Sequence, residues 1–266
     1  MEKKLEPLPT LTTKPPERNV TDRLRNPTAT GGISIKIEPD PDLLIALDHR
    51  NTVASESFSI LRSRLLSVHN KIGIKSIVIT SAEAGDGKTL VATNLAMSLG
   101  ELANKRILLV DGDLRTGKAT RASKLGARPG LGEFLQGKKT FDDVIHPTVF
   151  PWVSIAPTGL VPMRQLPEIL QSPSWSKFLD QAKQKFDLII VDSLPGSAPV
   201  ADLEILTAPC DAILIVVYMR RTRREALRRA IARLDSKKIL GVIINNSDEI
   251  YDYDYNYYGS RSQNAK

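Results

Sequence analysis

Short apolar runs alternate with helical patterns through the middle of the chain. The runs SIVIT, ILLVD, FDLIIVD, AILIVV and LGVII each predict a strand, and TLVATNLAMSLG, ADLEILT and EALRRAIARL predict helices between them. Continuous apolar runs of strand length that are separated by helices indicate a parallel sheet buried on both faces. We therefore expect a doubly wound, mostly parallel α/β fold with helices on both faces of the sheet.

The basic segment 219–238, MRRTRREALRRAIARLDSKK, carries much of the net charge of +7. Its apolar positions Leu227, Ile231 and Leu234 recur at helical spacing, so we expect them to face the sheet and the arginines to face water. A solvated helix face explains this pattern, and docking of acidic tails from neighbours or an anionic membrane surface would also explain it. The segment has no interleaved aromatic residues, so we expect no nucleic acid partner.

Composition divides the 266 residues into three parts. Residues 1–45 hold seven of the 17 prolines and many charges, which predicts a disordered lead. Residues 46–246 are the predicted folded domain, and residues 247–266 are a predicted flexible tail. Asp252 and Asp254 alternate with tyrosines there, which excludes a core strand and leaves an exposed cluster or simply a sticky, disordered end. The clustered tyrosines are Tyr251, Tyr253, Tyr255, Tyr257 and Tyr258.

Cysteine, histidine and apolar content exclude several classes of protein. The single cysteine, Cys210, allows no internal disulfide, and its place beside a predicted strand favours a core residue over a nucleophile. The apolar stretches have strand length rather than membrane length, so we expect a cytoplasmic chain that reaches the membrane through a partner. His49, His69 and His146 lack metal-site spacing, so the only metal we expect is magnesium bound with a nucleotide.

A glycine-rich segment, SAEAGDGKT, follows the first predicted strand and precedes a predicted helix. Its glycines let backbone amides approach phosphates, Lys88 supplies a positive charge for the β and γ phosphates, and Thr89 offers a hydroxyl to magnesium. Ala82 stands where the first glycine of the common P-loop pattern would be. A surface turn or a non-hydrolysing site is the alternative. The predicted nucleotide-binding residues in this segment are Ala84, Gly85, Asp86, Gly87, Lys88, Thr89 and Leu90.

Two other predicted strands end in carboxylates. ILLVDGDLR ends in Asp111 and Asp113, whose spacing places both on one side if the strand stays extended through Gly112. FDLIIVDSLPG ends in Asp192, the kind of acidic residue that holds magnesium directly or through water. A single strand-end aspartate more often caps the following turn, but three of them beside a P-loop favour a metal and phosphate site.

These three motifs resemble the Walker A, Walker A′ and Walker B motifs of the bacterial tyrosine kinase family. Further similarity includes RPGLGEFLQGK at 128–138, LPEIL at 166–170 and the tyrosine-rich tail, so the resemblance covers about residues 50–258. It implies that Lys88 and Thr89 bind the phosphates and magnesium, and that Asp111 and Asp192 order the metal. It also implies that Asp113 lies near the incoming tyrosine hydroxyl and that Asn245 meets the adenine.

Two positions depart from related patterns. The Min and Par type ATPases carry a signature lysine where this chain has Glu83, which favours the kinase branch. The kinase family's E-x-x-R-x-x-R helix, associated with ring-shaped oligomers, is present here as Glu56, Ser59 and Arg62, so one arginine is missing. Glu56 and Arg62 are therefore the expected oligomer interface, of unspecified oligomer size.

The resemblance implies an ATP- and Mg²⁺-dependent protein-tyrosine autokinase. Its expected substrate is its own tyrosine cluster, phosphorylated in trans, and the expected process is bacterial exopolysaccharide or capsule synthesis and export. A membrane-embedded activator of the polysaccharide co-polymerase type is the expected partner, beside self-association through the kinase domain and the tail. A Min or Par type ATPase switch, or a nucleotide-binding adaptor without kinase activity, is the alternative function.

Overall fold

The computed structural model describes residues 53–103, 105–122, 128–198 and 200–247. All of them belong to one compact unit. The predicted lead (1–45) and all of the predicted tail after its first residue lie outside the described residues, together with the five clustered tyrosines. Their expected disorder and the expected domain boundaries therefore stay predictions.

Seven strands form one sheet in the spatial order β3, β4, β2, β5, β1, β6, β7. Every neighbouring pair is parallel except β3 with β4. Strand β5, which carries Asp192, lies between β1, which leads into the P-loop, and β2, which ends at Asp111. The three strands that carry the predicted motifs are therefore adjacent. The strands are β1 (Ser76–Ser81), β2 (Ile107–Asp111), β3 (His146–Pro147), β4 (Val153–Ala156), β5 (Leu188–Pro195), β6 (Ala212–Tyr218) and β7 (Ile239–Asn245).

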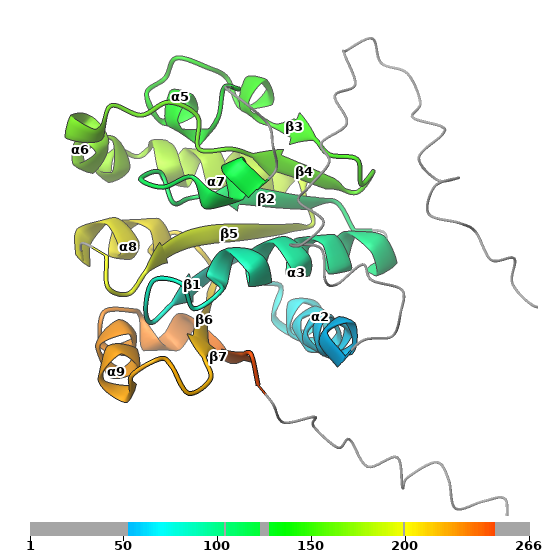
Figure 1. The fold of residues 1–266 in the computed structure, drawn as a ribbon. Helices are drawn as coiled ribbons and strands as arrows, with labels where there is room; N and C mark the ends of the chain where they lie inside the picture. The colour runs from blue at the N-terminus through cyan, green and yellow to red at the C-terminus, as the bar shows by residue number, and fades with distance from the viewer. Residues whose placement is uncertain (1–52, 104, 123–127, 199, 248–266) are drawn as a thin grey trace, which may run out of the picture. The chain divides into compact units, whose positions relative to one another are not determined.

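Helices cover both faces of this sheet, which confirms the predicted doubly wound α/β architecture (Figure 1). Helices α2 and α3 share one apolar cluster with the strands, and α5 to α8 share the other. None of the described helices is long and apolar enough to cross a membrane. The helices are α2 (Val53–Ile72), α3 (Lys88–Ala103), α4 (Lys118–Ala122), α5 (Leu131–Leu135), α6 (Leu166–Gln171), α7 (Ser174–Lys185), α8 (Val200–Thr207) and α9 (Arg224–Ala232), with 3₁₀ turns η3 (Asp142–Val144), η4 (Met163–Gln165) and η5 (Ser236–Lys238).

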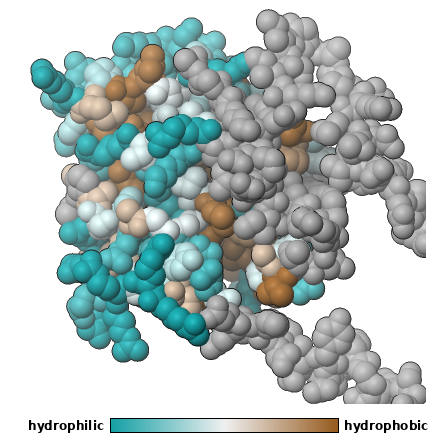
Figure 2. Space-filling model, viewed as in Figure 1, coloured by the Kyte–Doolittle hydropathy of each residue, from teal (hydrophilic) through white to brown (hydrophobic). Residues whose placement is uncertain are grey.

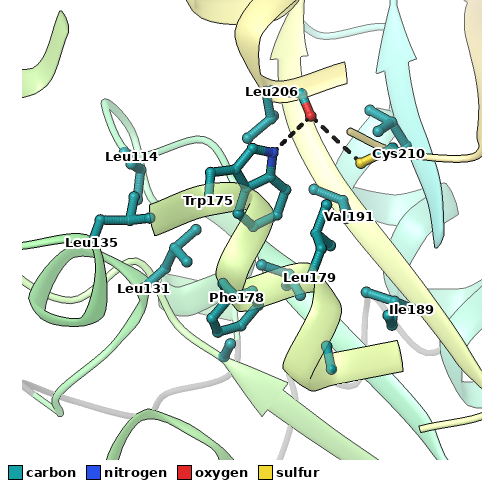
Figure 3. Packing of buried hydrophobic residues seen from close by; sticks show 14 of the residues in the cluster. Leu114, Leu131, Leu135, Trp175, Phe178, Leu179, Ile189, Val191, Leu206 and Cys210 are labelled. Carbon is teal, nitrogen blue, oxygen red and sulfur yellow. Dashed lines mark hydrogen bonds between the residues drawn. The ribbon is translucent and has the colours of Figure 1, made fainter. Parts of the chain in front are cut away.

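Aromatic side chains fill the core between the sheet and α7 (Figure 3). The ring of Phe178 lies 5.2 Å from that of Phe134, and Trp175 stacks on Phe178 at 5.7 Å. Trp175 Nε1 donates to the carbonyl of Leu206 at 2.9 Å, so its polar atom is satisfied inside the core. Cys210 is buried beside the same carbonyl, and burial raises the pKa of its thiol to about 12, which confirms a core role.

The two ends of the strand order differ from the sequence prediction. The short strand β4 pairs with β2, although the apolar pattern predicted no strand between ILLVD and FDLIIVD. At the other end, β7 pairs with β6 and is not buried on both faces. Its side chains alternate: Leu240, Val242 and Ile244 are exposed, whereas Ile239 and Ile243 pack against the core.

Helix α9 packs on the sheet through alanines rather than through its larger apolar residues. Ala226 and Ala230 are buried, Leu227 and Leu234 pack against the core, and Ile231 is 37% exposed. The prediction that Ile231 faces the sheet was therefore wrong. The reason is the close approach of the helix to the turn after β5. A Cβ on Gly196 would lie 2.5 Å from that of Ala230, which leaves room for small side chains only.

Candidate active site

The glycine-rich loop joins the end of β1 to the start of α3 at Lys88, which is the strand-to-helix setting of a phosphate-binding loop. Gly85 and Gly87 have φ angles of 89° and 98°, in the left-handed region that glycine adopts readily. Ala82, which replaces the first glycine of the pattern, is buried and packs against two alanines of α9. That substitution therefore contributes an apolar contact to the fold.

Three aspartates gather around Lys88 at the carboxyl edge of the sheet. Lys88 Nζ lies 3.7 Å from Asp113 Oδ2 and 3.8 Å from Asp192 Oδ1. Asp111 and Asp192 are register partners on the neighbouring strands β2 and β5. All four side chains are buried, with residue exposures of 6% or less. The structure thus brings together the four residues that the sequence predicted as catalytic.

Asp111 and Asp113 are each held by hydrogen bonds from a threonine. Strand β2 ends at Asp111, and the amide of the next residue, Gly112, still donates to the carbonyl of Asp192 on β5 at 2.8 Å. Thr116 donates to both carboxylate oxygens of Asp113, from its amide at 3.1 Å and its hydroxyl at 2.5 Å. Thr120 donates to Asp111 Oδ2 from its amide and its hydroxyl, each at 2.7 Å. Sequence reasoning missed both threonines, although an aspartate three residues before a threonine is a turn signal.

The oxygens of Asp192 and Thr89 suit a magnesium ion that binds together with a nucleotide. Thr89 Oγ1 donates to Asp192 Oδ2 at 2.8 Å, whereas the buried Asp192 Oδ1 has no hydrogen-bond partner. Magnesium binds proteins through one or two carboxylates, completed by phosphate oxygens and water. Within the described ranges, no three His, Cys, Asp or Glu side chains form a metal cluster by themselves.

Burial makes these carboxylates easier to protonate. It raises the pKa of Asp192 to about 7, against the attraction of Lys88, and that of Asp111 to about 6, against the hydrogen bonds from Thr120. The neighbouring carboxylates raise both pKa values further by repulsion. Carboxylates with such shifted pKa values beside a P-loop are candidates for a functional role.

The outer side of the P-loop is held by the segment between β6 and α9. Asp86 accepts a hydrogen bond from Thr222 Oγ1 at 2.8 Å, and Arg221 donates to the carbonyl of Gly85. Arg223 donates twice to Glu83 Oε1, at 2.7 and 3.0 Å. No sequence motif indicated these contacts, because the residues are about 136–140 positions apart.

Asn245 lies at the end of β7 and contacts the P-loop. Its Nδ2 donates to the carbonyl of Asp86 at 2.9 Å and occupies the space that a Cβ on Gly87 would need. The expected contact with adenine stays a prediction. Ala84 in the loop is exposed, and Leu90 at the start of α3 is half-buried. Apart from Asn245, the predicted nucleotide-binding residues are those of the loop and of the first turn of α3.

The predicted oligomer residues lie on α2. Glu56 is exposed, whereas Arg62 is half-buried and its Nη1 donates to Ser98 Oγ of α3 at 2.6 Å. Ser59, in place of the second arginine, donates to the carbonyl of Ser55 within the helix. Arg62 thus has a contact within its own chain, and its role between chains stays a prediction.

Comparison with known proteins agrees with this geometry. A family model described as an AAA domain matches residues 74–241. The chain is 32% identical to the tyrosine-protein kinase CpsD of Streptococcus agalactiae over 197 residues, which are 72% of this chain and 85% of CpsD. The chain belongs to the bacterial tyrosine kinase family. It is therefore a P-loop protein-tyrosine kinase, as the sequence resemblance implied.

Two further relatives contain a region that is similar to this chain. The kinase domain of the Escherichia coli tyrosine kinase ETK superposes with a TM-score of 0.70 at 25% identity, over 80% of this chain and 84% of that domain. The succinoglycan biosynthesis transport protein ExoP of Rhizobium meliloti is 34% identical over 65% of this chain. The match spans only 22% of ExoP, so most of that protein has no counterpart in the matched region.

Proposed function

We propose that this kinase transfers the γ-phosphoryl group of ATP to its C-terminal tyrosine cluster, on a neighbouring copy of the chain. The observation that carries the proposal is the gathering of Lys88, Asp113 and Asp192 beside the P-loop, in a chain whose tail holds five tyrosines. Phosphoryl transfer needs positioning and charge neutralisation rather than a strong covalent catalyst. This cluster supplies both.

Each residue of the cluster has a distinct role in the proposal. The P-loop amides and Lys88 bind the β and γ phosphates, and Lys88 neutralises charge that develops on them. Thr89 and Asp192, together with Asp111, hold magnesium, which supplies further neutralisation of the phosphates when it is bound. The unpartnered oxygen of Asp192 supports this assignment, because a buried carboxylate oxygen requires a partner.

Asp113 is the proposed acceptor of the tyrosine proton. The tyrosine oxygen forms a bond to the γ phosphorus, the bond from that phosphorus to the β–γ bridging oxygen breaks, and ADP leaves. The phenolic proton passes late in this step to Asp113, because the hydroxyl has an ordinary pKa of about 10 and stays protonated at neutral pH. The two hydrogen bonds from Thr116 fix the Asp113 carboxylate beside Lys88.

The position of the tail's first residues supports transfer between copies. Strand β7 ends at Asn245 on the P-loop edge, and the backbone amide of Met219 donates to the Asn245 carbonyl at 2.9 Å. The tail is therefore anchored beside its own P-loop, and it would have to turn back sharply to reach its own nucleotide. Hydrophilic side chains gather where α9 lies, at the lower left of Figure 2. Exposed Arg224 and Arg229 there complement an acidic tail from a neighbour.

Regulation of exopolysaccharide or capsule synthesis and export is the proposed process. The name of ExoP, a succinoglycan biosynthesis transport protein, supports it. We place the kinase at the inner face of the membrane through a membrane-embedded activator of the co-polymerase type. Both assignments rest on relatives.

A mixing experiment tests the proposed kinase reaction. A full-length Lys88→Met chain is incubated with ATP, magnesium and an active chain truncated after Asp248, in material from cells without other tyrosine kinases. We expect phosphotyrosine on the inactive chain, and a loss of at least about 100-fold when the truncated chain carries Asp192→Ala. Parallel arms add the cytoplasmic segment of a candidate activator, which should raise the rate.

The control is a tyrosine peptide offered to the truncated chain. If the peptide is phosphorylated while the Lys88→Met chain is not, transfer between copies is wrong although the kinase assignment holds. If neither is phosphorylated, with or without the activator segment, the proposed autokinase activity fails.

A further inference from the structure

The P-loop of this chain carries two acidic residues, Glu83 and Asp86, in a loop that is to receive a polyanion. A nucleoside triphosphate carries several negative charges, and a P-loop attracts it through amides and a lysine. Two carboxylates in the same loop oppose this attraction unless each is neutralised. Glu83 also stands where related ATPases carry a signature lysine, so the local charge at that position is inverted.

Three consecutive residues, 221–223, contact the carboxylates of Glu83 and Asp86. Asp86 is buried; its Oδ1 accepts from Thr222 at 2.8 Å and lies 3.4 Å from an Arg221 nitrogen, and its Oδ2 accepts from the Glu83 amide at 2.8 Å. Arg221 is itself stacked on the ring of Tyr218, 3.9 Å from its centroid. The carboxylate of Asp86 is therefore fully engaged inside the loop.

Glu83 is met by Arg223, the residue that precedes the first turn of α9. The guanidinium donates through Nε and one terminal nitrogen to Glu83 Oε1, and the Arg223 amide lies 3.4 Å from Glu83 Oε2. The hydrogen bond from Arg223 is the main reason why the pKa of Glu83 is lowered. Glu83 is thus ionised at neutral pH, and its charge is balanced by one arginine.

This ion pair does little for the stability of the fold. The side chain of Arg223 is 74% exposed and that of Glu83 is 23% exposed. Exposed ion pairs contribute little to stability, because water and salt screen them. An arginine that donates two hydrogen bonds to one oxygen of Glu83 therefore calls for a role other than folding, and the adjacent phosphate-binding loop offers one.

We propose that Arg223 is a positioning residue for ATP: it neutralises Glu83 and aims that carboxylate away from the phosphates. Where related ATPases carry a lysine in the loop, this chain has a carboxylate whose charge is balanced by Arg223, the residue before α9. Arg223 acts through Glu83 and need not touch the nucleotide. The inference rests on the proposed nucleotide site and adds a specific pair of residues to it.

A double-mutant cycle on the full-length chain tests this inference. We measure the equilibrium affinity for a fluorescent ATP analogue, with magnesium, for Arg223→Ala, Glu83→Ala, the double variant and the wild type. We expect Arg223→Ala to weaken binding about fivefold at low salt, because it leaves a bare carboxylate beside the phosphates. In the Glu83→Ala background the same removal of Arg223 should change affinity by less than about twofold.

Salt and matched variants separate this role from a structural one. The loss in Arg223→Ala should shrink as ionic strength rises, because screening weakens the repulsion. Arg223→Lys keeps the positive charge but loses the planar guanidinium group. Its affinity for the analogue should therefore lie between those of wild type and Arg223→Ala. Arg228→Ala is the control, since Arg228 pairs with Glu225 on the exposed side of the same helix and does not touch the P-loop.

Three outcomes would overturn the inference. They are wild-type affinity in Arg223→Ala, an equal loss in Arg228→Ala, and a double variant that binds as weakly as Arg223→Ala alone. The readout is nucleotide binding, so it is independent of tail phosphorylation. A chain that binds the analogue with the expected cycle but forms no phosphotyrosine would refute the proposed function and leave this inference intact.

Discussion

Asp192 and Asp211 stand at opposite ends of the same sheet, and their surroundings differ in burial and in partners: the Asp192 side chain is fully buried, whereas that of Asp211 is 29% exposed. Asp211 precedes β6 and accepts hydrogen bonds from the amides of Lys75 and Ser76, at 2.8 and 2.9 Å, and from Lys183 Nζ at 2.7 Å. Asp192, at the carboxyl end of β5, has one oxygen without a hydrogen-bond partner.

The two pKa values follow burial and partners together. Burial alone would raise the pKa of Asp211, but the hydrogen bonds from Lys183 and the two amides outweigh it, so the pKa is lowered. Burial raises the pKa of Asp192 to about 7 because Lys88 and Thr89 do not compensate it. At the amino end of the sheet, the carboxylate of Asp211 thus links neighbouring strands. At the carboxyl end, one oxygen of Asp192 is left unsatisfied, which costs stability and leaves a position for a ligand.

The largest effect is expected for Asp192→Asn. Tyrosine phosphorylation should fall at least about 100-fold, because the neutral amide is a poor magnesium ligand. The unliganded fold should become more stable at pH 8 by on the order of 1–2 kcal/mol, because no buried negative charge has to be formed. Activity assays and thermal unfolding without nucleotide measure the two effects. Lower stability in the variant would show that Lys88 compensates Asp192 fully.

Asp211→Ala should do the opposite. We expect a loss of about 1–2 kcal/mol of unfolding free energy, because the amides of Lys75 and Ser76 lose their acceptor. ATP affinity and phosphorylation rate should stay within about twofold of wild type, since this residue lies at the far end of the sheet. Urea unfolding and nucleotide titration test both statements. A large loss of ATP affinity would contradict the separation of the two ends.

The smallest effect is a difference in pH dependence. A carboxyl group whose pKa is raised on folding binds protons more tightly in the folded state, so its contribution to stability is lost as pH rises. The stability gap between Asp192→Asn and wild type should therefore widen from pH 5 to pH 8. Asp211 has a lowered pKa, so its contribution is present above its ordinary pKa of 3.8 and is lost below it. The difference in unfolding free energy between wild type and Asp211→Ala should be constant from pH 5 to 8 and narrow towards pH 3. An equal pH dependence of this difference for both variants would contradict the comparison.

The sequence predicted the central strands because they are buried on both faces and read as continuous apolar runs. It missed β4, whose four residues are flanked by Pro151 and Pro157 and give too short a pattern. It also misplaced Ile231, because helical spacing does not reveal that a glycine brings α9 close enough to favour alanines. A local sequence pattern indicates which residues of one element are buried, but it does not indicate the distance between two elements.

The candidate site divides in the same way. Lys88, Thr89, Asp111 and Asp192 were predictable, because each ends or follows a predicted strand at the sheet edge where ligands bind. The contacts of Arg223 with Glu83 join segments far apart in the chain, and no local motif encodes them. Such partners become visible only when the fold brings the β6–α9 segment onto the P-loop.

The close packing at Gly196 gives this chain a vulnerable position outside its active site. The Gly196 amide donates to the carbonyl of Ser81 at 2.6 Å, its own carbonyl accepts from Arg233 at 2.6 Å, and α9 lies directly against it. A methyl group at this position would push α9 outward and carry Arg223 away from Glu83. In a genetic screen, Gly196→Ala would therefore be recovered among loss-of-function alleles that resemble nucleotide-site defects, although the changed residue belongs to neither the P-loop nor the tail.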